Sequence, residues 1–145
     1  QKVAALLKKA DMGVVSDPHT GPLHARVREL IEEGVLVCLG QDDISDAYYP
    51  YGRNNMLEVA FLPSHLLWMT TSAEMETLYD MITVRAAQAM GLRDYGLRVG
   101  APAHLAVLDA PNVLEALRCH AAPAHVISHG KLVDRDRMRT MALST

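Results

Sequence analysis

The sequence predicts an α/β fold, and three observations support this prediction. Short, uniformly apolar segments alternate with longer segments that have one apolar and one charged face. This helix and strand order occurs twice before residue 40, and uniformly apolar strands are typical of a parallel sheet that helices cover on both faces. The chain has 145 residues, half of them hydrophobic, which is enough for one buried core.

The first forty residues supply the elements of this fold in order. Alanines and leucines recur at helical spacing opposite lysines, and a short apolar segment follows them. A turn with two prolines and a glycine then leads into a second amphipathic segment, which ends at a glycine. A second apolar segment then completes the pair of strands. The expected elements are a helix at 2–10, a strand at 12–16, a turn at 17–22, a helix at 23–33 and a strand at 35–39.

Two longer helices are expected in the middle of the chain. The first covers residues 54–69 and contains Pro63, which should kink it or split it in two, because proline lacks the backbone N–H that a helix interior uses. The second covers residues 73–90 and ends at Gly91, a natural residue after a helix end.

The last part of the chain has a different, β-rich pattern. A short apolar strand is expected at 104–109 and a short helix at 113–119. A strand, a glycine turn and another strand follow within 125–134. We therefore expect a small β-rich unit after the α/β part.

Composition narrows the classes of partner and compartment. The net charge is −3 and the basic residues are scattered, so we expect neither nucleic acid nor a membrane surface as a partner. Cys38 and Cys119 form no disulfide framework, which favours the cytoplasm. A helical pattern begins directly at Gln1, without a methionine or a capping residue, so we expect the chain to be a piece of a longer protein.

The candidate site follows the second predicted strand. Asp42 and Asp43 come directly after it, and in parallel sheets ligands bind at the carboxyl ends of the strands. A carboxylate there can bind a divalent metal and accept a proton from water, although such a pair can also cap a helix or solvate a loop. His19 follows the first predicted strand and is a weaker candidate for substrate contact at the same edge.

Three tyrosines follow the paired aspartates. Tyr48, Tyr49 and Tyr51 either form an aromatic wall for a planar ligand or pack their loop onto the scaffold, and the sequence leaves both interpretations open. No glycine-rich phosphate loop, no nucleophile elbow and no zinc deaminase signature of the H-x-E and P-C-x-x-C type is present.

Two segments resemble the amidohydrolase superfamily, and specifically its cytosine deaminase-like members. Residues 33–57, EGVLVCLGQDDISDAYYPYGRNNML, resemble the last barrel strand and the following loop, with G-x-D-[DN], then D-x-[WY]-x-P-x-G, then N-M-L. Residues 86–92, 94–96, 99–100 and 103–109 are similar to the ending A-x-x-[LM]-G-L and G-x-x-x-G-x-x-A-[DN]-L-x-V-L-[DP] of that superfamily.

This resemblance implies a fold, an activity and roles for residues. It implies the carboxyl-terminal part of a metal-dependent (β/α)8 TIM barrel, with its last two βα units in residues 1–95, plus part of a small β-sandwich in residues 96–145. The implied activity is hydrolysis of C–N bonds in cyclic amidines, such as cytosine to uracil and ammonia. Asp42 would contact a divalent metal, zinc or iron, and shuttle the proton, Asp43 would shape the substrate loop, and Tyr48 would lie near the base.

The same resemblance implies what lies outside the chain. Family members carry an H-x-H pair and two further histidines as metal ligands, and nothing in this sequence matches them. We therefore expect most metal ligands outside the chain, a nucleobase or related cyclic amidine as substrate, and a homo-oligomer.

Two alternatives remain at this point. The chain could be a non-catalytic fragment or scaffold that needs a partner to cover an exposed strand edge. Less favoured is a receiver-like phosphotransfer domain in which the paired aspartates bind Mg²⁺, because such a domain needs further alternating strands that the sequence does not show.

Overall fold

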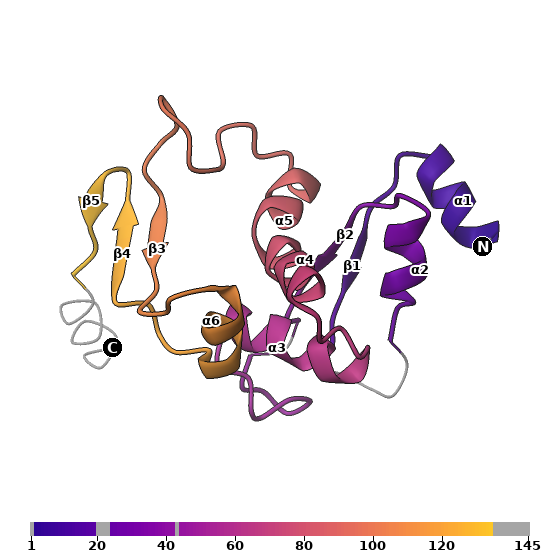
Figure 1. Cartoon of the computed structure of the whole chain (residues 1–145), viewed down its shortest axis with the longest axis horizontal. Coiled ribbons are helices and arrows are strands. Elements are labelled where there is room, and N and C mark those ends of the chain that lie inside the picture. The colour runs from indigo at the N-terminus through magenta and orange to yellow at the C-terminus, as the bar shows by residue number, and fades with distance from the viewer. Residues whose placement is uncertain (1, 20–23, 43, 135–145) are drawn as a thin grey trace.

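The computed structural model describes residues 2–19, 24–42 and 44–134. The described residues form two separate sheets: the first two strands make a parallel pair, and the last three strands make an antiparallel sheet (Figure 1). The elements are, in order, α1 (Lys2–Lys9), β1 (Val14–Ser16), α2 (Val27–Glu32), β2 (Val37–Leu39), α3 (Met56–Leu66), α4 (Ser72–Ile82), α5 (Val84–Ala89), β3 (Leu105–Val107), α6 (Val113–Cys119), β4 (His125–Ser128) and β5 (Lys131–Leu132). The predicted α/β class is confirmed.

The parallel pair lies between helices on both sides. In Figure 1, α1 and α2 lie on one side of β1 and β2, and α4 and α5 lie on the other. β2 contacts α2, α4 and α5, and all three of its residues are buried, as its uniformly apolar sequence VCL predicts. The strand therefore forms the centre of this half of the molecule.

Glycines set the geometry around the two strands. Gly34 has a φ of +78° after α2, and its N–H donates to the Ile31 carbonyl at 2.9 Å, so it ends that helix as predicted. Gly40 follows β2, and a Cβ at this position would lie 2.9 Å from Cγ1 of Val15 in β1. A larger residue at position 40 would push the two strand ends apart.

The two middle helices differ from the prediction in opposite ways. α3 runs through the buried Pro63 as one helix, so of the two expected outcomes, a kink or a split, the split does not occur. The single helix expected at 73–90 is wrong: α4 ends at Ile82, and α5 begins at Val84. Thr83 between them has non-helical φ and ψ of −125° and −97°, and its hydroxyl donates to the Tyr79 carbonyl at 2.8 Å.

Side chains cap the helices of this half. Asn55 accepts a hydrogen bond from the Leu57 N–H at 3.0 Å and begins α3. Thr71 and Glu74 form a reciprocal capping box at the start of α4. Arg28 of α2 pairs with the Glu74 carboxylate at 2.7 Å, which links α2 to the beginning of α4.

The antiparallel sheet and α6 make up the predicted β-rich unit. β4 is the central strand, and it pairs with β3 on one side and β5 on the other. α6 packs against α3 and α4, where Leu117 joins the same buried cluster as Val59 and Leu78. The helix of the carboxyl-terminal unit therefore shares the core of the α/β part.

Several large apolar side chains are exposed to solvent on the part of the chain that the structure describes. Several large ones are at least half exposed, on α1, on β1, after α3 and in the segment before β3: Val3, Leu6, Val15, Trp68, Leu97 and Val99. Among the described residues, no helix has both the length and the apolar character that a membrane span requires.

Candidate functional site

The candidate site lies where β1 and β2 end. The strands run parallel with Ser16 opposite Leu39, so the chain leaves both of them at the same edge. The Gly40 N–H donates to the Ser16 carbonyl at 3.0 Å and extends the pairing one residue further. The segments 17–19 and 40–42 are therefore neighbours in space.

Asp42 lies at this edge, three residues after the end of β2, and its side chain is exposed. Its φ is +55°, in the left-handed region that a short polar side chain tolerates better than most others. An exposed carboxylate at the carboxyl end of a parallel strand can accept a proton or bind a cation. Asp43, which was predicted beside it, lies outside the described residues.

His19 lies on the neighbouring segment, and its ring is covered. Its side chain is 1% exposed, and its Nδ1 lies 3.0 Å from Oδ1 of Asp17. The same carboxylate oxygen accepts the backbone N–H of His19 at 2.9 Å. An ionised carboxylate only accepts hydrogen bonds, so Nδ1 carries the hydrogen and this contact fixes the tautomer of the ring.

The three tyrosines separate into two groups. Tyr49 packs edge-to-face on His19 with ring centroids 4.7 Å apart, whereas Tyr48 and Tyr51 are 87% and 74% exposed. Tyr49 therefore packs the loop onto the scaffold. Tyr48 remains available to a ligand.

Electrostatics around Tyr49 favour its neutral form. Burial raises the pKa of the Tyr49 phenol, and the negative charges of Glu58 and Asp17 raise it further.

Asp46 holds the loop that carries Tyr48 and Tyr49. Its Oδ1 accepts the backbone N–H groups of Tyr48 at 2.8 Å and of Tyr49 at 3.0 Å.

The residues that the structure describes do not complete a metal site. Within 2–19, 24–42 and 44–134, no group of three or more histidine, cysteine, aspartate or glutamate side chains could hold a metal ion. A catalytic zinc takes about three protein ligands, and Asp42 can supply one of them. The rings of His104 and His129 lie 4.2 Å apart before β3 and after β4, but they are a pair only.

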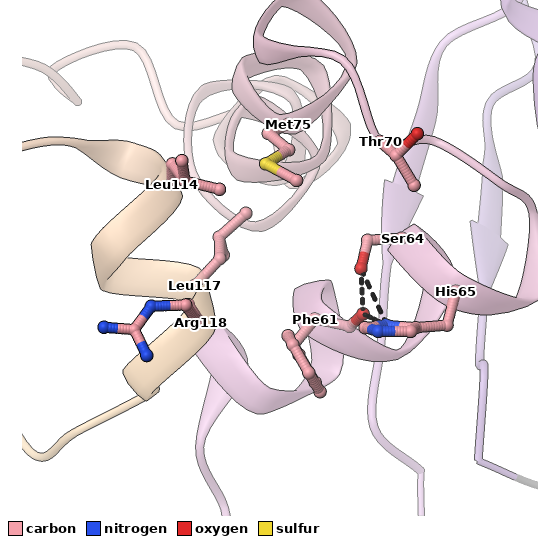
Figure 2. A pocket seen from close by; sticks show the side chains of 8 residues that line it. All are labelled: Phe61, Ser64, His65, Thr70, Met75, Leu114, Leu117 and Arg118. Carbon is pink, nitrogen blue, oxygen red and sulfur yellow. Dashed lines mark hydrogen bonds between the residues drawn. The ribbon is translucent and has the colours of Figure 1, made fainter.

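A separate apolar pocket lies between α3, α4 and α6 (Figure 2). Its volume is about 210 Å³, and its lining is mostly apolar, with Leu117 of α6 extending toward Met75 of α4. Two of its polar groups have partners: the Ser64 hydroxyl donates to the Phe61 carbonyl at 2.6 Å, and Arg118 pairs with Glu115. The full lining is Phe61, Ser64, His65, Thr70, Met75, Leu114, Leu117 and Arg118, and none of these residues carries a carboxylate for acid or base chemistry.

Sequence reasoning did not identify Asp17 or the specific role of Tyr49. The spacing Asp17-x-His19 was a usable signal, because an aspartate often accepts a hydrogen bond from the backbone two residues later. The contact between His19 and Tyr49 had no sequence signal, because thirty residues separate them.

The profile of the family described as "Amidohydrolase family" matches residues 1–134. An N-isopropylammelide isopropyl amidohydrolase from Pseudomonas sp. (strain ADP) is 28% identical over 134 residues, which are 92% of this chain and 33% of that protein.

Two solved structures are similar over most of the chain. A 5-methylcytosine deaminase from Klebsiella pneumoniae, liganded with 5-fluorocytosine, has a TM-score of 0.81 and 34% identity over 91% of this chain and 35% of its own. An N-isopropylammelide isopropylaminohydrolase from Burkholderia multivorans has a TM-score of 0.85 and 29% identity over 91% of this chain and 34% of its own. The chain thus spans about a third of the length of these relatives.

Proposed function

The chain belongs to the amidohydrolase family, and from this premise we propose that it is part of a metal-dependent hydrolase that deaminates cytosine or a related cyclic amidine. The sequence prediction of the family is confirmed, and the similarity to a 5-methylcytosine deaminase supports the cytosine deaminase-like subgroup. The observation that carries the proposal is the exposed carboxylate of Asp42 at the carboxyl edge of the parallel pair.

In this proposal Asp42 moves the proton of the reaction. Its carboxylate accepts a proton from the attacking water as the C–O bond forms, and it then gives a proton to the nitrogen that leaves as ammonia when the C–N bond breaks. A bound divalent metal, zinc or iron, would make that water more acidic, with Asp42 as one ligand and the others outside the described residues.

Other residues of the loop would contact the substrate. We assign Asp43 and Tyr48 to the substrate side, and for Tyr48 the support is its 87% exposure beside the packed Tyr49. For His19, the sequence suggested substrate contact as a weaker candidate, and we propose a positioning role instead, because its ring is 1% exposed and lies between Asp17 and Tyr49.

The proposed domain organisation follows the two sheets. Residues 1–95 would supply the last two βα units of a (β/α)8 barrel, which the parallel pair supports. Residues 96–145 would supply the carboxyl-terminal part of a β-sandwich, which the antiparallel sheet within 105–132 supports. We also propose a homo-oligomer, which sedimentation of the complete protein tests.

The test uses the longest open reading frame that contains this chain. The purified product is assayed for ammonia release from cytosine and 5-methylcytosine and for isopropylamine release from N-isopropylammelide, with Asp42→Asn as the variant. We expect a loss of about 10²–10⁴-fold in turnover, since removing one general acid/base has an effect of that size.

A matched control separates this effect from a general loss of charge. Asp94→Asn also removes one carboxylate, and that carboxylate is 79% exposed and pairs with Arg98 away from the strand ends. Its turnover should stay near that of the parent. Near-normal turnover in Asp42→Asn would contradict the proposal.

The alternative is that the 145-residue chain is a non-catalytic piece that needs a partner. The exposed apolar side chains, such as Val15 of β1 at 67%, favour a missing neighbour beside the parallel pair. Sedimentation of the chain alone decides this: self-association without ammonia release supports the alternative, and a monomer that releases ammonia refutes it. The family match leaves the receiver-like interpretation without support.

A further inference from the structure

We propose that Asp17, His19 and Tyr49 form a latch that joins the loops after β1 and β2 and thereby positions the segment from Asp42 to Tyr48. The proposal rests on the proposed function for its catalytic consequence, but not for its structural one. It assigns positioning roles to these three residues and leaves the proton transfer to Asp42.

The first half of the latch lies on the loop after β1. Oδ1 of Asp17 accepts both the backbone N–H of His19 at 2.9 Å and its Nδ1–H at 3.0 Å. The two contacts fix the backbone and the ring of His19 together. Because the ring is 1% exposed, it acts as a rigid surface rather than as a solvated side chain.

The second half lies on the loop after β2. Tyr49 places its ring edge-to-face against His19, at a centroid distance of 4.7 Å and an interplanar angle of 68°. Its backbone N–H is held by Asp46, as is that of Tyr48. The contact with His19 therefore fixes a short turn, not a single side chain.

The strand pairing and the latch hold the two ends of the segment between them. At one end, Gly40 is fixed to Ser16 by the extended pairing of the strands. At the other end, Tyr49 is fixed to His19. The exposed Asp42 and Tyr48 lie between these two points, so releasing Tyr49 would leave the segment without a fixed point between Gly40 and the start of α3, which Asn55 caps.

Hydrogen–deuterium exchange on the 145-residue chain tests the structural part. The backbone N–H groups of Tyr48 and Tyr49 are followed in His19→Ala and Tyr49→Ala, with the N–H groups of β2 as the reference for an intact fold. We expect exchange at Tyr48 and Tyr49 to rise about tenfold in each variant, the size expected for losing one aromatic pair. Unchanged exchange at both positions in both variants would overturn the latch.

Two further variants keep the test decisive. Tyr49→Phe retains the ring that packs on His19, so exchange at Tyr48 should stay within a factor of about two of the parent. If an alanine variant loses protection in β2, Tyr49→Leu replaces it, since leucine keeps apolar volume but has no ring edge. Equal exchange in Tyr49→Leu and Tyr49→Phe would also refute the proposal.

Kinetics of the complete protein test the catalytic part. His19→Ala should lower kcat more than it raises KM, because a loosely held Asp42 meets bound substrate in the wrong geometry. His19→Asn keeps a side-chain N–H near Asp17 and should recover part of kcat. An unchanged kcat in His19→Ala overturns this part.

The two proposals fail in distinguishable ways. If the complete protein releases no ammonia, the proposed function fails, whereas the exchange result still decides the latch. If Asp42→Asn is inactive but His19→Ala changes neither exchange nor kcat, the latch fails and the proposed function stands.

Discussion

The Asn55 side chain makes two hydrogen bonds, so its replacement should lower the free energy of unfolding more than the loss of an ordinary helix cap does. Its Oδ1 accepts the Leu57 N–H at 3.0 Å at the start of α3, and its Nδ2 donates at 2.6 Å to the carbonyl of His120, the residue that ends α6. The second bond joins positions 65 residues apart and leaves a partly buried carbonyl without this donor when the amide is removed.

The magnitude follows from the two bonds. A lost cap costs about 1 kcal/mol and a lost internal hydrogen bond about 1 kcal/mol, so Asn55→Ala should lower the free energy of unfolding by about 2 kcal/mol. Asn55→Asp keeps the cap acceptor but loses the donor, so it should cost about 1 kcal/mol or more.

Asn112 is the matched control for Asn55. It caps α6 by accepting the Glu115 N–H at 2.9 Å, and it supplies the cap without the long-range bond. Asn112→Ala should cost about 1 kcal/mol, and Asn112→Asp should be close to neutral. Urea unfolding followed by circular dichroism, at one fixed protein concentration, measures all four variants. Equal stability of Asn55→Asp and the parent would refute the reasoning.

Two further predictions concern charge and reactivity. Hydrogen bonds from the backbone and side chain of Thr71, with help from Arg28, lower the pKa of Glu74. The stabilising effect of the ionised Glu74 is therefore present above its unfolded pKa of about 4.5 and is lost as the pH falls through the lower folded pKa. Glu74→Gln should therefore flatten the acid side of a plot of urea midpoint against pH. An unchanged plot contradicts this prediction. Burial raises the pKa of the Cys38 thiol, whereas Cys119 is exposed. A thiol reagent should therefore modify Cys119 first and Cys38 only on unfolding, and the time course of the reaction measures this order.

The sequence was sufficient to predict the elements that depend on local pattern. The alternation of apolar strands with amphipathic helices predicted β1, α2 and β2, and Gly34 was recognised because a helix end needs a residue that tolerates positive φ. The helix at 113–119 was predicted with its observed bounds.

The errors occurred where a side chain or the tertiary structure competes with the helical pattern. Residues 73–90 have continuous helical periodicity, but Thr83 breaks the helix, and its hydroxyl bonds the Tyr79 carbonyl one turn earlier. At Pro63 the reverse happened: the proline is fully buried in α3, and the packing around it holds one helix together despite the missing N–H.

The candidate site was only partly accessible to sequence reasoning. The placement of Asp42 at a strand end follows from the order of the elements alone. The packing of His19 on Tyr49 requires that the two loops lie side by side, which is a consequence of the parallel register of β1 and β2 rather than of any local pattern.

The positive φ of Asp42 affects how the proposed proton transfer by this residue could be lost in a lineage. Asparagine and glycine fit the same backbone conformation, so either can replace the aspartate and remove the carboxylate while the loop keeps its shape. A bulky or β-branched replacement would disturb the loop as well. Descendants that have abandoned the chemistry but kept the fold should therefore carry asparagine or glycine at position 42 more often than any other residue.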